Sequence, residues 1–117
     1  MVAKTIDFLA REIRYDLDVP VLLYLLDGVA AGHTINISGS GVLAVFNNRR
    51  VDAWDTGRLR IETRGGYLSI EVRVARVEGH QAGMTFRIEN ESDRVTIREL
   101  IALAMLGLAI LPPAPAA

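Results

Sequence analysis

Short segments rich in β-branched and aliphatic residues alternate with glycine-rich or polar turns through the middle of the chain. Six such segments are predicted as strands: Val19–Leu26, His33–Ser38, Val42–Phe46, Arg58–Glu62, Tyr67–Glu78 and the inward-facing row Met84, Phe86 and Ile88. The turn signals between them include Asp27-Gly28, Ser38-Gly39-Ser40-Gly41 and Arg64-Gly65-Gly66. Short strands joined by such turns predict a six-stranded antiparallel β-barrel, because closure removes the exposed edges of the sheet.

Two of these strands carry patterns that predict where their side chains point. In the second strand, strict alternation places Thr34, Asn36 and Ser38 together on one face. In the fifth strand, the alternation breaks at Ala75-Arg76-Val77, which predicts a β-bulge. We expect the fifth strand to be followed by a turn over Gly79–Gly83.

The period of the pattern changes after the last strand and becomes helical. Ser92 and Asp93 are favourable N-cap residues, and the strong helix formers that follow predict a hydrophobic C-terminal helix over residues 92–111. From Leu100 to Leu111 no residue is charged, and the leucines point in several directions around the helix. Since a barrel covers only one side of a helix, the remaining apolar surface predicts a homo-oligomer assembled through this helix.

These elements divide the chain into four parts. Residues 1–15 form an N-terminal arm with a short helix over about Thr5–Ile13, residues 16–91 form the barrel, residues 92–111 form the helix, and residues 112–117 form a Pro/Ala tail. The apolar end of the helix is too short to span a bilayer of roughly 30 Å before the prolines stop it. The charged N-terminus has no apolar core of the kind found in secretory signals.

The composition argues against several classes of function. The 117 residues include 13 basic and 14 acidic side chains, with one Trp, three Tyr and three Phe, which argues against nucleic acid as a partner. The absence of cysteine removes thiolate chemistry and fits a cytoplasmic protein. His33 and His80 have no carboxylate nearby at metal-ligand spacing, and no nucleophile has a base and an orienting group. We therefore expect no metal, no cofactor and no catalytic residues, hence no enzyme.

The residues best suited to ligand binding lie in two short motifs. Asn36, Ser38 and Gly41 form an Asn-x-Ser-x-x-Gly pattern, in which an amide and a hydroxyl can hydrogen-bond the edge of a heterocyclic base. Arg11 and Arg14 can bind phosphate through bidentate, charge-assisted hydrogen bonds. Both motifs also have a structural interpretation, because Asn and Ser often end a strand and arginines often lie on solvated helix ends.

The order and spacing of these motifs resemble the PilZ domain family, the bacterial receptors for cyclic di-GMP. Besides the Asn-x-Ser-x-x-Gly motif, the similar features are Arg14-Tyr15, Pro20-Val21 and the last strand Ala82–Phe86 before a capped helix. The resemblance covers about residues 9–108. It implies an all-β fold with a terminal helix: a six-stranded antiparallel PilZ-like barrel with a flexible N-terminal arm and a C-terminal α-helix.

The resemblance also implies a ligand and a regulatory role. Arg11 and Arg14 would contact phosphate and stack on guanine of cyclic di-GMP, while Asn36, Ser38 and Gly41 would form the floor that reads guanine. Binding would order the arm and so control an effector protein or an adjacent domain. Such a receptor would work in the cytoplasm or, through its partner, at the cytoplasmic face of the inner membrane.

One position departs from the family pattern of two arginines four residues apart. The residue four before Arg14 is Ala10, and Arg11 follows it. Loss of one charge-assisted contact would weaken binding about 10- to 100-fold. The alternative interpretation is a PilZ-like structural or oligomerisation module that binds cyclic di-GMP weakly or not at all.

Overall fold

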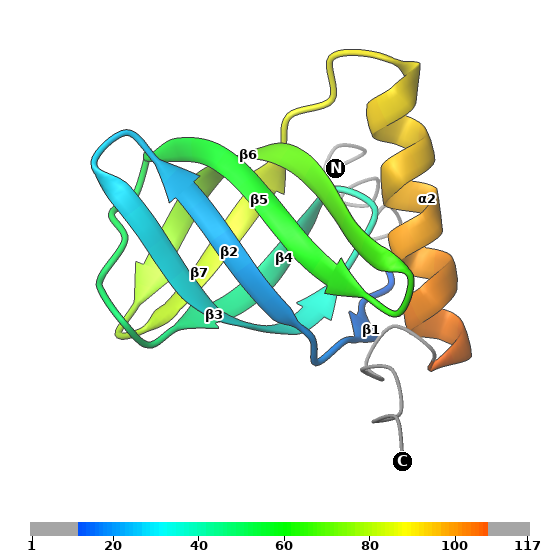
Figure 1. Ribbon diagram of the computed structural model, residues 1–117, viewed down its shortest axis with the longest axis horizontal. Coiled ribbons are helices and arrows are strands. Elements are labelled where there is room, and N and C mark those ends of the chain that lie inside the picture. Colours follow the sequence, from blue (N-terminus) through cyan, green and yellow to red (C-terminus); the bar gives the residue numbers. More distant parts are fainter. Residues whose placement is uncertain (1–11, 108–117) are drawn as a thin grey trace, which may run out of the picture.

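The computed structural model describes residues 12–107 (Figure 1). Its elements are β1 (Tyr15–Asp16), β2 (Pro20–Leu25), β3 (Gly28–Ile37), β4 (Gly41–Phe46), β5 (Thr56–Thr63), β6 (Gly66–Glu78), β7 (Gln81–Phe86) and α2 (Glu91–Leu106). Most of the helix predicted in the N-terminal arm and the predicted helical residues 108–111 lie outside the described range.

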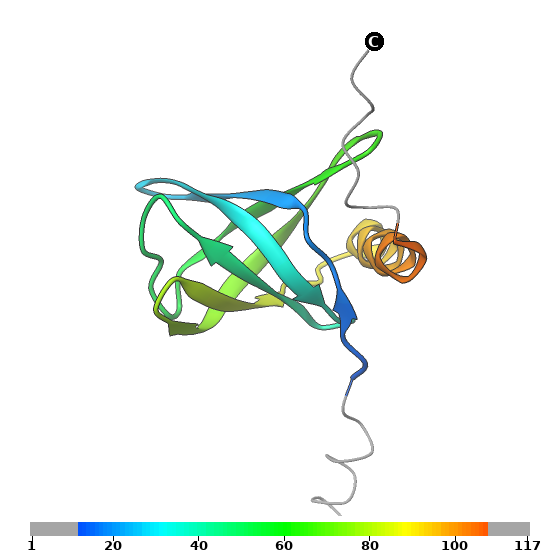
Figure 2. The same ribbon diagram turned by 90° about the horizontal axis from the view of Figure 1, so that it is seen from below.

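The strands form one sheet that closes on itself. Their order is β3-β2-β5-β6-β7-β4, every neighbouring pair is antiparallel, and β4 pairs back onto β3. β1 lies outside this ring and pairs with the end of β3, with Tyr15 opposite Ile37 and Asp16 opposite Asn36. The six-stranded antiparallel barrel expected from the sequence is confirmed (Figures 1 and 2).

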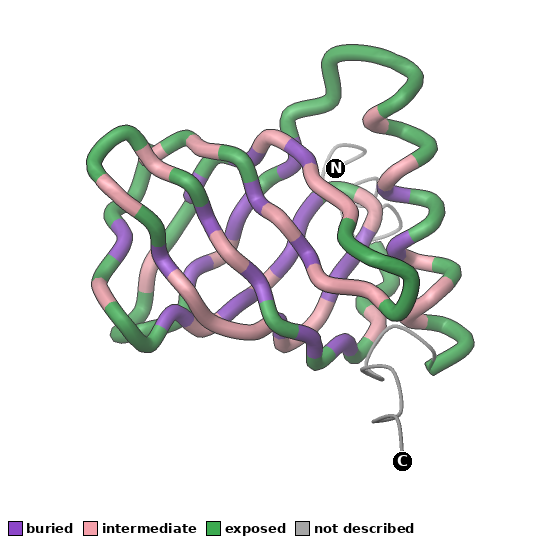
Figure 3. The backbone as a smooth tube through the Cα atoms, in the orientation of Figure 1, coloured by how far each residue is buried: buried purple, intermediate pink, exposed green. Residues whose placement is uncertain are grey.

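Apolar side chains fill the barrel interior. Buried positions alternate with less buried ones along most of the strands, with breaks in β3 and β6 (Figure 3). All six barrel strands contribute side chains that are at most 5% exposed: Val21, Leu23, Ala30, Ile37, Val42, Ala44, Phe46, Leu59, Ile61, Ile70, Val72, Val74, Ala82, Met84 and Phe86. Thr34 is a polar residue in this interior. Its hydroxyl donates to the Leu17 carbonyl and accepts from the Val19 N–H, so its burial leaves no unpaired polar group.

A β-bulge in β3 changes the faces predicted for this strand. The pairing with β4 shifts between Thr34 and Asn36, which makes Ile35 the extra residue. Thr34 and Ile37 are both buried although they are three residues apart, and Asn36 between them lies on the outer face. The prediction that Thr34, Asn36 and Ser38 share one face is therefore wrong, because the bulge interrupts the alternation.

A second β-bulge lies in β6, where the sequence pattern predicted one. The pairing with β7 shifts between Val74 and Arg76, so Ala75 is the extra residue. Val74 is buried opposite Met84, whereas Arg76 is exposed opposite Gly83. Without the extra residue, Arg76 would point inward like Val74 and would bury an unpaired guanidinium at great cost.

Some strand ends differ from the sequence-based prediction. β3 begins at Gly28 rather than His33, because β2 supplies partners for its first half and stabilises residues of low strand propensity. β7 begins at Gln81, so the predicted turn over Gly79–Gly83 is shorter. Ile88 is exposed rather than inward-facing, because β7 ends two residues before it.

The N-cap of α2 lies two to three residues before the caps predicted from the sequence. Asn90 is the N-cap, and its side-chain oxygen accepts from the Asp93 N–H at 2.9 Å. The Asp93 carboxylate in turn accepts from the Glu89 N–H at 2.9 Å. The predicted caps Ser92 and Asp93 therefore lie in the first turn, and Gly107 ends the helix in a left-handed conformation.

α2 lies beside one end of the barrel and packs against β1, β3 and β6 (Figures 1 and 2). Its buried side chains are Ile97 and Leu100. Near its end, Met105 and Leu106 are exposed by 62% and 67%. No helix within residues 12–107 is long and apolar enough to cross a membrane.

The cap assignment makes a testable prediction about stability. Asn90→Ala should lower the free energy of unfolding by about 1 kcal/mol, because it removes the acceptor for an N-terminal N–H of α2. Ser92→Ala is the matched control and should change it by less than about 0.5 kcal/mol. Urea unfolding followed by circular dichroism measures both; equal effects of the two substitutions would contradict the assignment.

Candidate functional site

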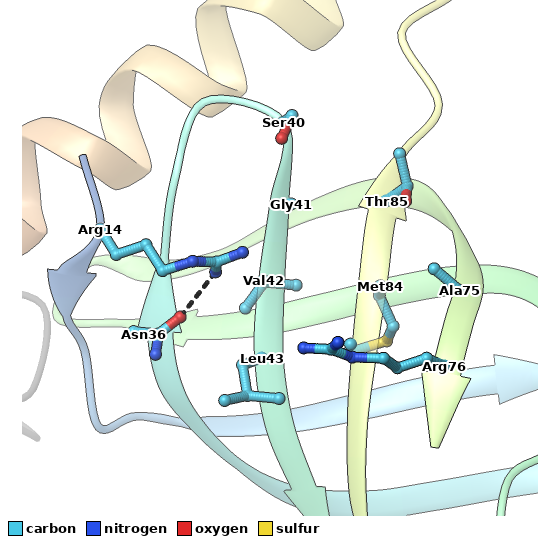
Figure 4. Close-up of a pocket in the computed structure, with 11 residues that line it drawn as sticks. Arg14, Asn36, Ser40, Gly41, Val42, Leu43, Ala75, Arg76, Met84 and Thr85 are labelled. Atoms are coloured by element: carbon cyan, nitrogen blue, oxygen red, sulfur yellow. Dashed lines mark hydrogen bonds between the residues drawn. The ribbon is translucent and has the colours of Figure 1, made fainter. Parts of the chain in front are cut away.

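A pocket of about 420 Å³ lies on the outer face of the barrel, over β4 and β7 (Figure 4). Side chains and backbone from the arm and from four strands line it: Arg14, Asn36, Ser40, Gly41, Val42, Leu43, Ala75, Arg76, Gly83, Met84 and Thr85. Arginine lies at both of its edges, so the pocket combines positive charge with a partly apolar base.

The pocket follows one row of paired residues across four strands. Asn36 of β3 lies opposite Leu43 of β4, Leu43 lies opposite Gly83 of β7, and Gly83 lies opposite Arg76 of β6. Neighbouring strands are about 4.8 Å apart, so the row spans at most about 14 Å between its two polar ends. The β3 and β6 bulges turn these two end residues outward, so both bulges serve the same pocket.

The short strand β1 holds the arm against the pocket. Arg14 directly precedes Tyr15, which pairs with Ile37, so the long Arg14 side chain can reach Asn36, the residue before Ile37. The Arg14 guanidinium donates to the side-chain oxygen of Asn36 at 2.9 Å (Figure 4). A guanidinium has five N–H donors, so this bond leaves most of them available to a ligand.

The turn between β3 and β4 is closed by Ser38. This residue is 1% exposed, its N–H donates to the Gly41 carbonyl at 2.9 Å, and it does not line the pocket. The Glu12 carboxylate accepts from the Ser38 hydroxyl at 3.2 Å and also from the Ser40 hydroxyl. The turn therefore already binds an anionic group next to the pocket, and that group comes from the arm.

The two glycines of the pocket, Gly41 and Gly83, differ in the space that an added Cβ would find. A Cβ on Gly41 would lie 2.2 Å from the Met84 carbonyl oxygen, so the close pairing of β4 with β7 requires glycine there. A Cβ on Gly83 would meet its nearest atoms, in Arg76, at 3.9 and 4.0 Å, which is ordinary contact. The fold therefore tolerates a side chain at Gly83, and glycine there leaves the pocket open.

Comparison with known proteins identifies the family of this barrel. A model of the PilZ domain family matches residues 9–104. The chain belongs to the PilZ family. The PilZ domain is known as a receptor fold for cyclic di-GMP. No curated protein sequence matches this PilZ domain.

Several solved structures share the PilZ fold at low sequence identity. The PilZ domain of CeSA from a cellulose-synthesizing bacterium is 18% identical, with a TM-score of 0.68 over 77% of this chain and 95% of that chain. The PilZ domain of Escherichia coli YcgR, solved with c-di-GMP, is 9% identical, with a TM-score of 0.71 over 83% and 92%. The Bacillus subtilis inhibitor of motility MotI/DgrA is 15% identical, with a TM-score of 0.62 over 83% and 51%. At these identities the likeness shows the fold alone.

The structure brings together part of the predicted ligand-binding set. Three of the five residues line the pocket of this PilZ domain: Arg14, Asn36 and Gly41. Ser38 lies in the turn beside it, and Arg11 lies outside the described residues. Sequence reasoning did not propose Arg76 as a ligand residue, although the predicted bulge at this position was a signal that its side chain is reoriented.

Ionisable groups with shifted pKa values lie away from the pocket. The Arg49 guanidinium hydrogen-bonds the Asp27 carboxylate and holds the pKa of Asp27 below its usual range. A hydrogen bond to the Glu62 carboxylate raises the pKa of Arg60. Within residues 12–107, no three His, Asp or Glu side chains are grouped to hold a metal ion.

The different roles of the two pocket glycines predict different effects on stability. Gly41→Ala should lower the free energy of unfolding by about 1–3 kcal/mol or more, because the added Cβ forces β4 away from β7. Gly83→Ala is the matched control, and its stability should be unchanged or higher by up to about 1 kcal/mol. Urea unfolding tests both; a Gly83→Ala variant as unstable as Gly41→Ala would refute this distinction.

Proposed function

We propose that this PilZ domain is a regulatory receptor for cyclic di-GMP. The observation that carries the proposal is the placement of Arg14 and Asn36 together at one edge of the outer pocket. A guanidinium binds phosphate through charge-assisted hydrogen bonds, and an Asn amide can both donate to and accept from a base edge. Leu43, next to Asn36 in the row, offers an apolar surface for the base.

The contacts of the arm suggest how binding is converted into a signal. A phosphate bound to Arg14 would be repelled by the nearby Glu12 carboxylate, so binding favours release of Glu12 from the serine hydroxyls. Arg14 directly precedes β1, and α2 packs on β1. Binding would therefore reorganise the arm next to α2 and change the surface that an effector protein or adjacent domain contacts.

Calorimetric titration of the full chain with cyclic di-GMP tests the proposed function. We expect binding, and we expect Arg14→Ala to weaken it about 10- to 100-fold through loss of a charge-assisted contact. The melting temperature should not change, because Arg14 is exposed. Ala10→Arg should tighten binding by restoring the two-arginine pattern in the arm.

The control substitution is Arg64→Ala, which removes an exposed arginine that does not line the pocket. It should leave the affinity for cyclic di-GMP unchanged. Absence of both heat and NMR chemical-shift changes at millimolar cyclic di-GMP would refute the proposed function. Unfolding of the Arg14→Ala variant would show instead that this arginine is structural.

A second proposed role is self-association through α2, which the alternative interpretation also requires. The exposed side chains of Met105 and Leu106 lie together at the end of the helix. Burying them against another copy of α2 would contribute about 25 cal/mol for each Å² of apolar surface removed from water. This role does not depend on nucleotide binding.

Sedimentation of the full chain at micromolar concentration tests the self-association. We expect an oligomer, and we expect Met105→Gln combined with Leu106→Gln to raise its dissociation constant by about tenfold or more. Ile88→Gln removes an apolar side chain that is exposed by 39% outside the helix, and it should have no such effect. A wild-type chain that sediments as a monomer would refute this role.

A further inference from the structure

Arg76 lies at the edge of the pocket opposite Arg14. It is exposed, and its side chain extends past Met84 toward Leu43 and the centre of the pocket (Figure 4). Among the residues that the structure describes, its guanidinium forms no ion pair, whereas Arg58 on the neighbouring strand β5 is paired with Glu71. Its donors are therefore open to a ligand.

The backbone of β6 is bent so that Arg76 faces the pocket. The bulge at Ala75 turns Arg76 outward, whereas strict alternation would point its side chain into the barrel. The bulge in β3 does the same for Asn36, at the other end of the same row of paired residues. Bulges often reorient a side chain next to a functional site, and here two of them act on one pocket.

The residue between these two ends of the row also indicates a ligand. Gly83 separates Arg76 from Leu43, and nothing in the fold prevents a side chain there. A glycine in the interior of a strand weakens the strand and often marks a place where a ligand approaches the backbone closely. Gly83 thus leaves space beside the Arg76 side chain.

We propose that Arg76 is a second phosphate-binding residue, and that Arg14 and Arg76 each bind one of the two phosphates of a single cyclic dinucleotide. The proposal rests on the proposed function and extends it to the barrel side of the pocket. The two phosphates of a cyclic dinucleotide lie on opposite sides of one ring, as the two guanidinium groups lie on opposite edges of one pocket. Since Arg76 is anchored on β6, its contact requires no ordering of the arm.

Titration of the full chain with cyclic di-GMP by calorimetry tests this role. Arg76→Ala should weaken binding about 10- to 100-fold, and Arg76→Lys should weaken it less because it keeps the charge. Arg64→Ala is the control: it also removes one positive charge, but away from the pocket, and it should bind like the wild type. Circular dichroism and melting temperature should be unchanged in all three variants, because both arginines are exposed.

Gly83→Ala supplies a test that leaves every charge in place. Its methyl group should weaken binding about tenfold by filling the space beside Arg76, while the melting temperature stays equal or rises. Wild-type binding with equal affinities for Arg76→Ala and Arg64→Ala would overturn this inference and leave the proposed function intact. A wild type that binds no cyclic di-GMP would overturn the proposed function, and this inference with it.

Discussion

The pairing of β4 with both β3 and β7 is the constraint on which the rest of the structure depends. It closes the sheet, leaves no free edge among the six barrel strands, and encloses one apolar core. It also makes β4 and β7 the base of the outer pocket, since residues of β3 and β6 then lie on either side of them. The close approach at Gly41 shows how tightly this pairing is made. Stability and the candidate site thus depend on the same strand contacts.

The two β-bulges place polar side chains at defined positions on the outer surface of the closed barrel. In a regular strand, Asn36 would face inward like Thr34, and Arg76 would face inward like Val74. One extra residue in each strand avoids burying an amide and a guanidinium in an apolar core. The same extra residues place both groups in one row on the outside, where a polar ligand can reach them. Each bulge therefore serves the core and the pocket together.

The arm links the pocket to the rest of the molecule. Glu12 contacts the β3–β4 turn, Arg14 contacts Asn36, and β1 joins the arm to both the barrel and α2. These contacts consist of a few side-chain hydrogen bonds and a two-residue strand, so they are weak compared with the barrel core. In the proposed function, a ligand that competes for these contacts would reorganise the arm without disturbing the barrel. This division between a rigid barrel and a weakly held arm suits a regulatory domain.

The sequence by itself determined the strands of the barrel, the bulge at Ala75, the C-terminal helix and the PilZ family, because alternation, turn residues and short motifs are local signals. It did not determine the bulge in β3, since His33–Ser38 alternates without a break and only the register against β4 reveals the extra residue. Nor did it show that Ser38 would be buried in the turn, or that Arg76 would share a pocket with Arg14. Those outcomes depend on contacts between residues that are distant in the chain. Barrel closure brings β6 and β7 beside β4, and the pairing of β1 with β3 holds Arg14 at the same pocket.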